Sequence, residues 1–128
     1  MKTQYTVALA MLAGIGIGAA AVQSLHAQAK PPVYIVSEID VTNVDAYTKE
    51  YVPLARAAIK NSAGKLLGAS QKVIMIEGAP QNARVTINAY DSVEAAQASR
   101  NAADYKKARE IGDKYAKFRA YIVEGVPQ

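Results

Sequence analysis

Glu38 is the carboxylate that the sequence places best for chemistry. It lies in the middle of an otherwise apolar run, Val33–Val41, that is rich in β-branched residues. A carboxylate buried there must be paired with a cation or must stay protonated. It could take a proton from an acidic C–H as a general base, or it could form a structural ion pair. We expect Asn88 and Arg119, on neighbouring strands, to reach Glu38, and we favour a Glu–Arg pair at a subunit interface.

Tyrosine dominates the aromatic content, with eight Tyr, one Phe and no Trp. Tyr47 and Tyr51 are four residues apart, so they project from the same side of a helix. A phenol combines an apolar body with a polar tip, which suits a ligand cleft, although packing in a core or interface is its commoner role. Arg109 follows Tyr105 by four residues and could bind an anionic ligand group or lie in solvent. The candidate pocket residues are Tyr47, Tyr51, Asn88, Tyr90, Tyr105, Arg109 and Arg119.

Several kinds of site are excluded by composition. The chain has no Cys, and its single His, His26, falls within a predicted export signal. Disulfides, thiolate or imidazole metal sites, His-ligated haem and nucleophiles that need a His or Cys partner are therefore excluded from the mature chain. Asp40, Asp45 and Glu50 are close in sequence but lack the spacing of a calcium loop. We expect no metal site and no cofactor.

The first 29 residues have the pattern of a secretory signal peptide. Lys2 precedes an apolar run over 5–22, and Ala27 and Ala29 form an A-x-A cleavage pattern. The alternative is an uncleaved membrane anchor, which the small residues of the run and the A-x-A pattern disfavour. We expect cleavage after Ala29, a periplasmic or secreted protein without membrane attachment, and a single domain over 30–128.

Charge gives no indication of a nucleic-acid partner. Without Lys2, the predicted mature chain has 14 basic and 11 acidic side chains. Six of the basic residues fall within 106–119, but Glu110 and Asp113 are interleaved with them. Mixed charges of this kind are typical of a solvated helix face, and we expect no nucleic-acid binding.

A helix is predicted to follow the first strand. Thr42 can cap it, with Asp45 as the capping-box partner, and a 3.6-residue period of apolar side chains extends it over about 43–61. Pro53 lies inside this range and should kink or divide the helix. Gly64 is the expected left-handed residue at its end.

The rest of the chain alternates strands and helices. We expect a second strand region over 65–70 and 72–77, with a bulge or bend near 68–71, and then a turn over 78–82. In the third strand, Arg84, Thr86, Asn88 and Tyr90 should share one face. The remaining predicted elements are the third strand over 83–90, a helix over 93–100 capped by Asp91-Ser92, a helix over 102–115 capped by Asn101 with Asp104, and a last strand over 117–126.

The element order is β-α-β-β-α-β in one small domain. This order predicts an α+β, ferredoxin-like sandwich, in which a four-stranded antiparallel sheet carries both helices on one face. The strands are apolar on both sides, so the uncovered face also needs a partner. We therefore expect a homodimer formed through the open sheet face.

An ordered set of short motifs carries a family resemblance. The motifs are Tyr34-Ile35-Val36, Asp40-Val41-Thr42, Tyr47, Gly64-Lys65-Leu66-Leu67, Ile76-Glu77-Gly78, Arg84-Val85, Ser92-Val93-Glu94-Ala95-Ala96, Asp104-Tyr105 and the tail from Phe118 to Val126. With these motifs in this order, the chain resembles the family of unknown function numbered 1330, within the dimeric α-β barrel superfamily, over about residues 33–126.

The resemblance implies a dimer whose two sheets face each other as a barrel, but no established reaction. Related barrels include cofactor-free monooxygenases, muconolactone isomerase-like proteins and haem-degrading enzymes, and the haem relatives use a His that this mature chain lacks. Family members often carry an acid followed by an aromatic at the end of the third strand, whereas here Ala89 precedes Tyr90.

Three functions remain open at this point. The favoured one is an exported dimer that binds a small, partly aromatic molecule between helices and sheet. The second is a cofactor-independent monooxygenase or isomerase with Glu38 as base, which follows mostly from the analogy of fold. The third is a structural or partner-binding dimer with a solid interior.

Overall fold

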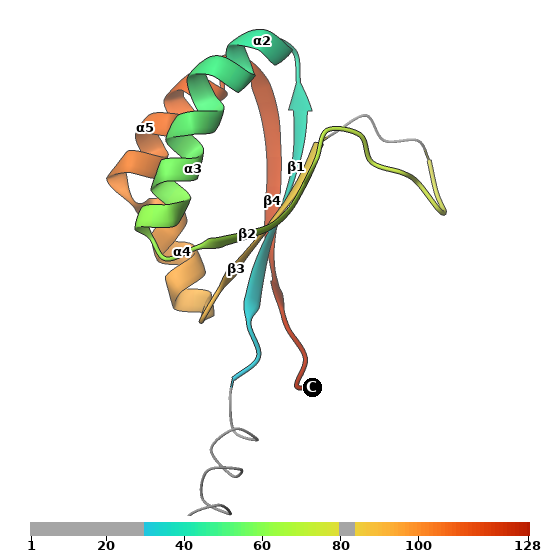
Figure 1. Ribbon diagram of the computed structural model, residues 1–128, viewed down its shortest axis with the longest axis vertical. Helices are drawn as coiled ribbons and strands as arrows, with labels where there is room; N and C mark the ends of the chain where they lie inside the picture. Colours follow the sequence, from blue (N-terminus) through green and yellow to red (C-terminus); the bar gives the residue numbers. More distant parts are fainter. Residues whose placement is uncertain (1–29, 80–83) are drawn as a thin grey trace, which may run out of the picture. The chain divides into compact units, whose positions relative to one another are not determined.

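The computed structural model describes residues 30–79 and 84–128. Two parts of the chain lie outside these ranges. They are the predicted export signal and residues 80–83, which include the last three residues of the predicted turn over 78–82. Within them, no helix is long and apolar enough to cross a membrane. The elements in chain order (Figure 1) are β1 (Val33–Val41), α2 (Val44–Ala46), η1 (Tyr47–Tyr51), α3 (Val52–Asn61), β2 (Lys65–Ser70), β3 (Arg84–Tyr90), α4 (Val93–Asn101), α5 (Ala103–Gly112) and β4 (Ala116–Glu124).

The four strands form one antiparallel sheet in the order β2-β3-β1-β4. β1 is central and pairs with both β3 and β4, which agrees with its content of β-branched and aromatic residues. The βαββαβ chain order with this strand order is the ferredoxin-like arrangement, so the predicted α+β fold is confirmed. Side chains along β1 alternate between a fully buried and a half-buried face, and the fully buried residues are Val33, Ile35, Ser37 and Ile39.

The predicted helix over 43–61 forms as α2, η1 and α3 in direct succession. Its N-cap is Asn43, whose side chain accepts from the Ala46 amide at 3.1 Å, so the predicted Thr42 cap is wrong. Thr42 instead donates its hydroxyl to the Tyr115 carbonyl at 2.9 Å. Pro53 lies in the first turn of α3, directly after the wider π turn of η1. In a regular α-helix the proline ring would clash with the carbonyl of the residue four positions earlier. That residue lies in η1, where the backbone follows the wider π turn and not the regular α-helix.

Gly64 is needed at the end of α3, but for a different reason from the predicted one. The left-handed residue is Ala63, with φ 59°, and Gly64 has no positive φ. A Cβ atom on Gly64 would lie 2.6 Å from the Tyr90 hydroxyl oxygen and 2.8 Å from Ile59 Cγ2. The glycine therefore permits the close approach of the chain to Tyr90.

β2 ends at Ser70, and the predicted continuation over 72–77 is not a strand. A register shift is present between Leu66 and Gly68, at the N-terminal edge of the bulge or bend predicted near 68–71. Ser70 already pairs with Val85, the second residue of β3, so almost no residue of β3 is left to pair with a longer β2. The segment 71–79, here called the arm, leaves the sheet instead, and its Ile76 is fully exposed.

The second helical region is divided into α4 and α5. Ser92 caps α4 as predicted, because its hydroxyl accepts from the Ala95 amide at 3.0 Å. The predicted Asn101 cap of α5 is wrong, since the N-cap is Ala102 and no side chain bonds there. Asp104 instead joins two helices, accepting from Asn61 of α3 at 3.2 Å.

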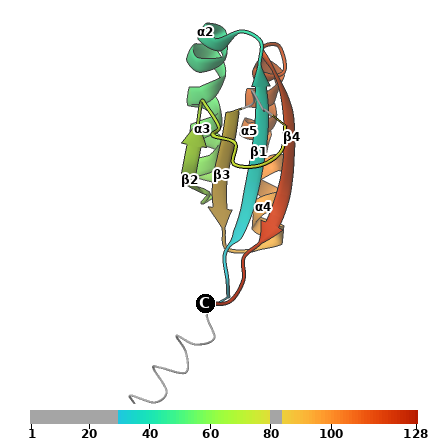
Figure 2. The same cartoon turned by 90° about the vertical axis from the view of Figure 1, so that its right-hand side faces the viewer.

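All the described helices lie on one face of the sheet, as predicted (Figures 1 and 2). Small helix residues allow the layers to approach: Ala58, Ala96 and Ala108 are each at most 2 % exposed. One core cluster packs Ile39 of β1 against Tyr47 and Tyr51 and against the alanines of α3, α5 and β4. A second cluster at the other end of the sheet contains Val33, Ile35, Tyr90 and Ala96.

No described helix covers the other side of the sheet, here called the open face. Its large apolar residues remain partly exposed, with Ile87 at 36 %, Tyr121 at 42 % and Val123 at 43 %. The arm projects from this same side, as both ribbon views show (Figures 1 and 2). The protein therefore presents an uncovered apolar sheet face and an exposed apolar segment on the same side.

Candidate functional site

A cavity of about 590 Å³ lies between the helical layer and the sheet. Its floor comes from the helix-facing side of the sheet, including Ser37, Thr86 and Asn88, and its walls come from η1, α3 and α5. Ligand pockets commonly have this size and combine apolar walls with a few polar groups. The cavity therefore has the volume for a small molecule of one or two rings.

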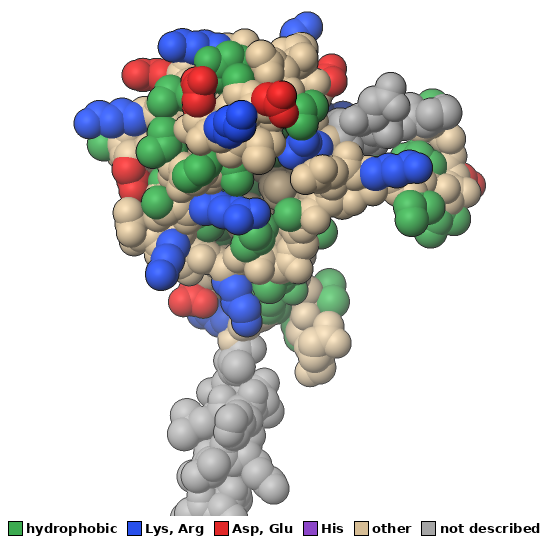
Figure 3. All heavy atoms as spheres, turned by 45° about the horizontal axis from the view of Figure 1, so that its top comes forward, with side chains coloured by type: hydrophobic (Ala, Val, Ile, Leu, Met, Phe, Trp, Pro, Cys, Tyr) green, Lys and Arg blue, Asp and Glu red, His purple; other side chains and the backbone are tan. Residues whose placement is uncertain are grey.

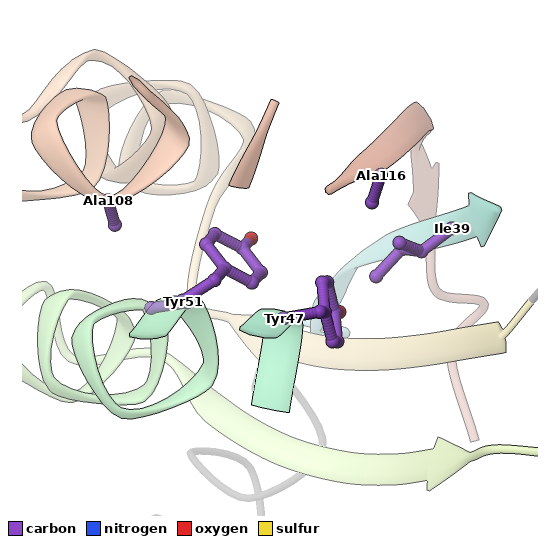
Figure 4. Close-up of a cluster of buried hydrophobic side chains, with 6 residues drawn as sticks. Ile39, Tyr47, Tyr51, Ala108 and Ala116 are labelled. Atoms are coloured by element: carbon purple, nitrogen blue, oxygen red, sulfur yellow. The ribbon is translucent and has the colours of Figure 1, made fainter. Parts of the chain in front are cut away.

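Three tyrosines form one wall of the cavity. Tyr47 and Tyr51 come from η1 and Tyr105 from α5, and all three are at most 6 % exposed. The Tyr47 and Tyr51 rings have centroids 5.0 Å apart, and Tyr51 meets Phe118 edge-on at 5.3 Å. In Figure 4, Tyr47 and Tyr51 extend from their helix into the space between α5 and the sheet. The structure thus brings together three of the predicted pocket residues.

The phenols of Tyr47 and Tyr51 are neutral groups near neutral pH. Burial raises the pKa of Tyr47 above 10.0, and the nearby Arg84 offsets this only in part. Burial raises the pKa of Tyr51 still further, and the neighbouring Tyr105 adds to the effect. Both phenols can exchange hydrogen bonds with a ligand, but neither is suited to act as a phenolate base near neutral pH.

Asn88 and Tyr90 lie on the helix-facing side of β3, as predicted. Asn88 is 1 % exposed and lines the cavity, and its Oδ1 has no hydrogen-bond partner among the described residues. An acceptor buried in this way is costly unless something bonds to it. Tyr90 is also buried, but it packs against Gly64 and does not line the cavity.

Three arginines that were not among the predicted pocket residues also line the cavity, namely Arg56, Arg84 and Arg100, and the last two stack on its tyrosines. The Arg84 guanidinium carbon lies 5.1 Å from the Tyr47 ring centroid, and that of Arg100 lies 4.4 Å from the Tyr105 centroid. Arg84 was predicted to share a face of its strand with Asn88 and Tyr90, and Arg100 follows the buried Ala96 by one helical turn. These spacings are the sequence signal for both arginines, but they are weak signals, because exposed charges often have the same spacing.

Glu38 and Arg119 form the expected pair, but outside the cavity. They face each other across β1 and β4 on the open face, with Arg119 Nε 3.4 Å from Glu38 Oε2. The expected contact of Glu38 with Asn88 does not form, because β1 pairs Asn88 with Ile35 and turns it toward the helices. The best catalytic candidate and the pocket therefore lie on opposite sides of the sheet.

Arg109 also lies outside the cavity wall. Its guanidinium carbon is 3.8 Å from the Phe118 ring centroid, and it forms a 2.9 Å ion pair with Asp113 one turn later. Burial acts to lower the pKa of Arg109, but hydrogen bonds to Asp113 and to Tyr105 outweigh it and raise the pKa. Arg109 already has an anionic partner, so it is a poor candidate for binding another.

The described ranges contain no group of three or more His, Cys, Asp or Glu side chains that could hold a metal ion. Lys and Arg side chains alternate with Asp and Glu over the face seen in Figure 3. A second hollow of about 490 Å³ lies beside β4 and is lined by Ile35, Ala96 and Ile122. It also borders Arg100 but contains none of the three tyrosines of the wall.

The layers and the cavity define a ferredoxin-like α+β protein with a pocket between helices and sheet. Residues 32–126 match the family described as "Domain of unknown function (DUF1330)". The chain belongs to this family, as the order of its motifs predicted. No curated protein matches it.

Solved structures with the same fold are distant in sequence. RPA0582 from Rhodopseudomonas palustris, a protein of unknown function, is 16% identical with a TM-score of 0.56, over 77% of this chain and 85% of that chain. SnoaB, a cofactor-independent oxygenase from Streptomyces nogalater, is 12% identical with a TM-score of 0.50, over 77% and 96%. A dimeric protein of unknown function from Bacteroides fragilis is 10% identical with a TM-score of 0.51, over 73% and 95%. At these identities the likeness concerns the fold alone.

Proposed function

We propose that the protein binds a small, partly aromatic molecule in the cavity between its helices and its sheet. The observation that carries the proposal is the cavity of about 590 Å³, with its wall of buried tyrosines and with the unpartnered Asn88 oxygen. The rings offer flat apolar surface, and the hydroxyl and amide groups can fix the orientation of a ligand. A solid interior, which a purely structural dimer would have, does not agree with this volume.

The alternative is a cofactor-independent monooxygenase or isomerase. The shared fold with SnoaB motivates it, but a fold does not by itself carry a reaction. Among the described residues that line the cavity there is no carboxylate, and Glu38 faces the open side of the sheet. A general base must be within hydrogen-bond reach of its proton. Binding without turnover is therefore better supported.

The test is a titration with a small neutral aromatic probe, 4-hydroxybenzyl alcohol. Protein produced from the full sequence and labelled with ¹⁵N should show amide shifts around the cavity, with a Kd on the order of 1 mM for so small a molecule. Ala69→Trp should weaken binding about tenfold or more, because Ala69 lines the cavity from the exposed edge strand.

Leu67→Trp is the matched control, since Leu67 lies on the same strand and does not line the cavity. It should leave the affinity for the probe unchanged. Shifts confined to the open face would overturn the binding proposal, and so would the absence of shifts with this alcohol, with its anionic analogue 4-hydroxybenzoate and with inorganic phosphate.

We also propose that the protein is a homodimer formed through the open face. The exposed Ile87, Tyr121 and Val123 and the projecting arm support this, because large uncovered apolar surfaces usually mark interfaces. The dimeric description of the Bacteroides fragilis structure agrees with it. In a face-to-face dimer, the Glu38–Arg119 pair of each protomer would lie at the interface.

Export belongs to the proposal as well. The charged start, the apolar run and the A-x-A pattern before Lys30 support a signal peptide that is cleaved after Ala29. The released chain would then act in the periplasm or outside the cell. Ligand binding between the helices and the sheet is compatible with either location, because it needs no cofactor that is confined to the cytoplasm.

A further inference from the structure

We infer that the cavity selects an aromatic carboxylate, whose anionic group is held by Arg100 with help from Arg84. This inference rests on the proposed binding function and specifies the chemical class of the ligand. Five observations carry it: the unpaired donors of Arg100, the position of Arg84, the charge of the cavity wall, the phenol rings of that wall and the acceptor on Asn88.

Arg100 has donors without acceptors. Its Nε and Nη1 atoms are buried and have no hydrogen-bond partner among the described residues. The guanidinium is held in place against the Tyr105 ring, with its carbon 4.4 Å from the centroid. A buried cation with unsatisfied N–H groups is unfavourable, and a carboxylate can satisfy two of them with parallel hydrogen bonds. An anion in the cavity would therefore be favoured beside Arg100.

Arg84 adds a second positive charge to the cavity from the sheet side. It stacks 5.1 Å from the Tyr47 centroid and forms no ion pair with any described carboxylate within 4.0 Å. Arg56 and Lys60 of α3 also line the cavity. The described lining therefore has four basic side chains and no acidic one, which gives it a positive potential that favours an anion.

The remaining features favour an aromatic ligand over a simple ion. The phenol rings of Tyr47, Tyr51 and Tyr105 offer far more apolar surface than a phosphate or sulfate ion can cover. The unpartnered Oδ1 of Asn88 can accept a hydrogen bond from a hydroxyl group of the ligand. An aromatic ring that carries a carboxylate and a hydroxyl group would use all of these groups.

The experiment compares three probes on protein produced from the full sequence. 4-Hydroxybenzoate and 4-hydroxybenzyl alcohol share their ring and size and differ in charge, and inorganic phosphate is an anion without a ring. We expect 4-hydroxybenzoate to bind about tenfold or more tightly than the alcohol, and phosphate to bind more weakly than 4-hydroxybenzoate.

Variants then test which side chain binds the carboxylate of the probe. Arg100→Gln should reduce the affinity for 4-hydroxybenzoate about tenfold and change that for the alcohol less than about threefold. Arg100→Lys should retain part of the preference for 4-hydroxybenzoate over the alcohol. It keeps the positive charge but loses the planar guanidinium, which can donate two parallel hydrogen bonds to a carboxylate. Arg84→Gln should give a smaller loss, which provides a second test if Arg100→Gln does not fold. Lys107→Gln removes an exposed charge away from the cavity and should have no effect.

The outcomes separate this inference from the binding proposal. Equal affinities for the acid and the alcohol in the unaltered protein would overturn the anion selection and leave the binding proposal intact. Phosphate binding as tight as that of the aromatic acid would overturn the aromatic part. A failure of all three probes to bind would overturn the binding proposal and this inference together.

Discussion

At the scale of single residues, the buried tyrosines tie stability to the same groups that shape the cavity. Tyr51 packs against Tyr47 and Phe118, and Gly112 is close enough that a Cβ atom there would lie 2.6 Å from the Tyr51 ring. Burial and the neighbouring Tyr105 hydroxyl both disfavour the Tyr51 phenolate. The folded state therefore binds this proton more tightly than the unfolded chain does.

We predict that the free energy of unfolding falls as the pH rises above about 10 and that Tyr51→Phe reduces this fall. The folded-state pKa of Tyr51 is raised above 10.0, so its contribution is complete below pH 10 and is lost as the pH rises toward that folded-state value. Between pH 8 and pH 11 the variant should lose about 1.4 kcal/mol less than the unaltered protein. Denaturant unfolding at a series of pH values measures this difference.

Phe118→Leu is the control for this prediction. It alters the packing against the Tyr51 ring but removes no ionisable group, so it should keep the full decline with pH. An unchanged decline in Tyr51→Phe would show that this phenol does not ionise differently in the folded and unfolded states.

Residue types alone indicated part of the candidate site. The tyrosines were recognised because their number and their helical spacing are visible in the sequence. Arg84 and Arg100 were missed because a charged side chain on an inward-facing position resembles any other surface charge until the opposite wall is known. Glu38 was interpreted as a pocket or interface group, and only the packing of the helices against the other face of β1 decides its side of the sheet.

At the scale of elements, the helix starts depend on single side-chain hydrogen bonds. Ser92 and Asn43 each accept a backbone N–H in the first turn of a helix. Asn101 was also predicted as a cap, yet Ala102 occupies that position at the start of α5. A capping residue is easily misplaced by one position in sequence analysis, because neighbouring polar residues have similar propensities.

We predict that Ser92→Ala lowers the free energy of unfolding by about 1 kcal/mol, the usual effect of losing an N-cap hydrogen bond. Asn101→Ala should change it by less than about 0.5 kcal/mol, since the Asn101 side chain makes no capping bond in the structure. Denaturant unfolding of both variants under the same conditions measures the contrast. Equal losses in the two variants would contradict the cap assignment.

At the scale of the whole molecule, the sheet has one covered and one open side. We predict a dimer of the 30–128 chain when the full sequence is expressed in an exporting cell. Native mass spectrometry measures the mature mass and the oligomeric state together, and sedimentation measures the association constant. A monomer at about 100 µM would contradict the dimer, and a mass that includes residues 1–29 would contradict cleavage.

Ile87→Lys should shift this equilibrium to the monomer, because it places a charge in the middle of the open apolar face. Leu54→Lys is the matched control, since Leu54 is similarly exposed on α3, on the helical side of the sheet. It should leave the dimer intact. Dissociation of both variants to the same extent would indicate that the open face is not the specific interface.

The sequence by itself determined the order and type of most elements, the ferredoxin-like topology and the family. Hydrophobic periodicity and turn residues are local signals, and the right-handed crossover rule leaves few ways to arrange βαββαβ. These signals extend over the whole domain, so the two wrong caps, Thr42 and Asn101, do not alter the topology.

Only the tertiary structure decided where β2 stops, which side of the sheet carries Glu38, and which cations meet the tyrosines. Each of these depends on a partner that is distant in sequence. The end of β3 limits β2, the helices that cover the opposite face of β1 decide the side of Glu38, and the packing of α4 and α5 against the sheet places Arg100 beside Tyr105. Pairing register and layer packing are non-local, so local propensity contains no information about them.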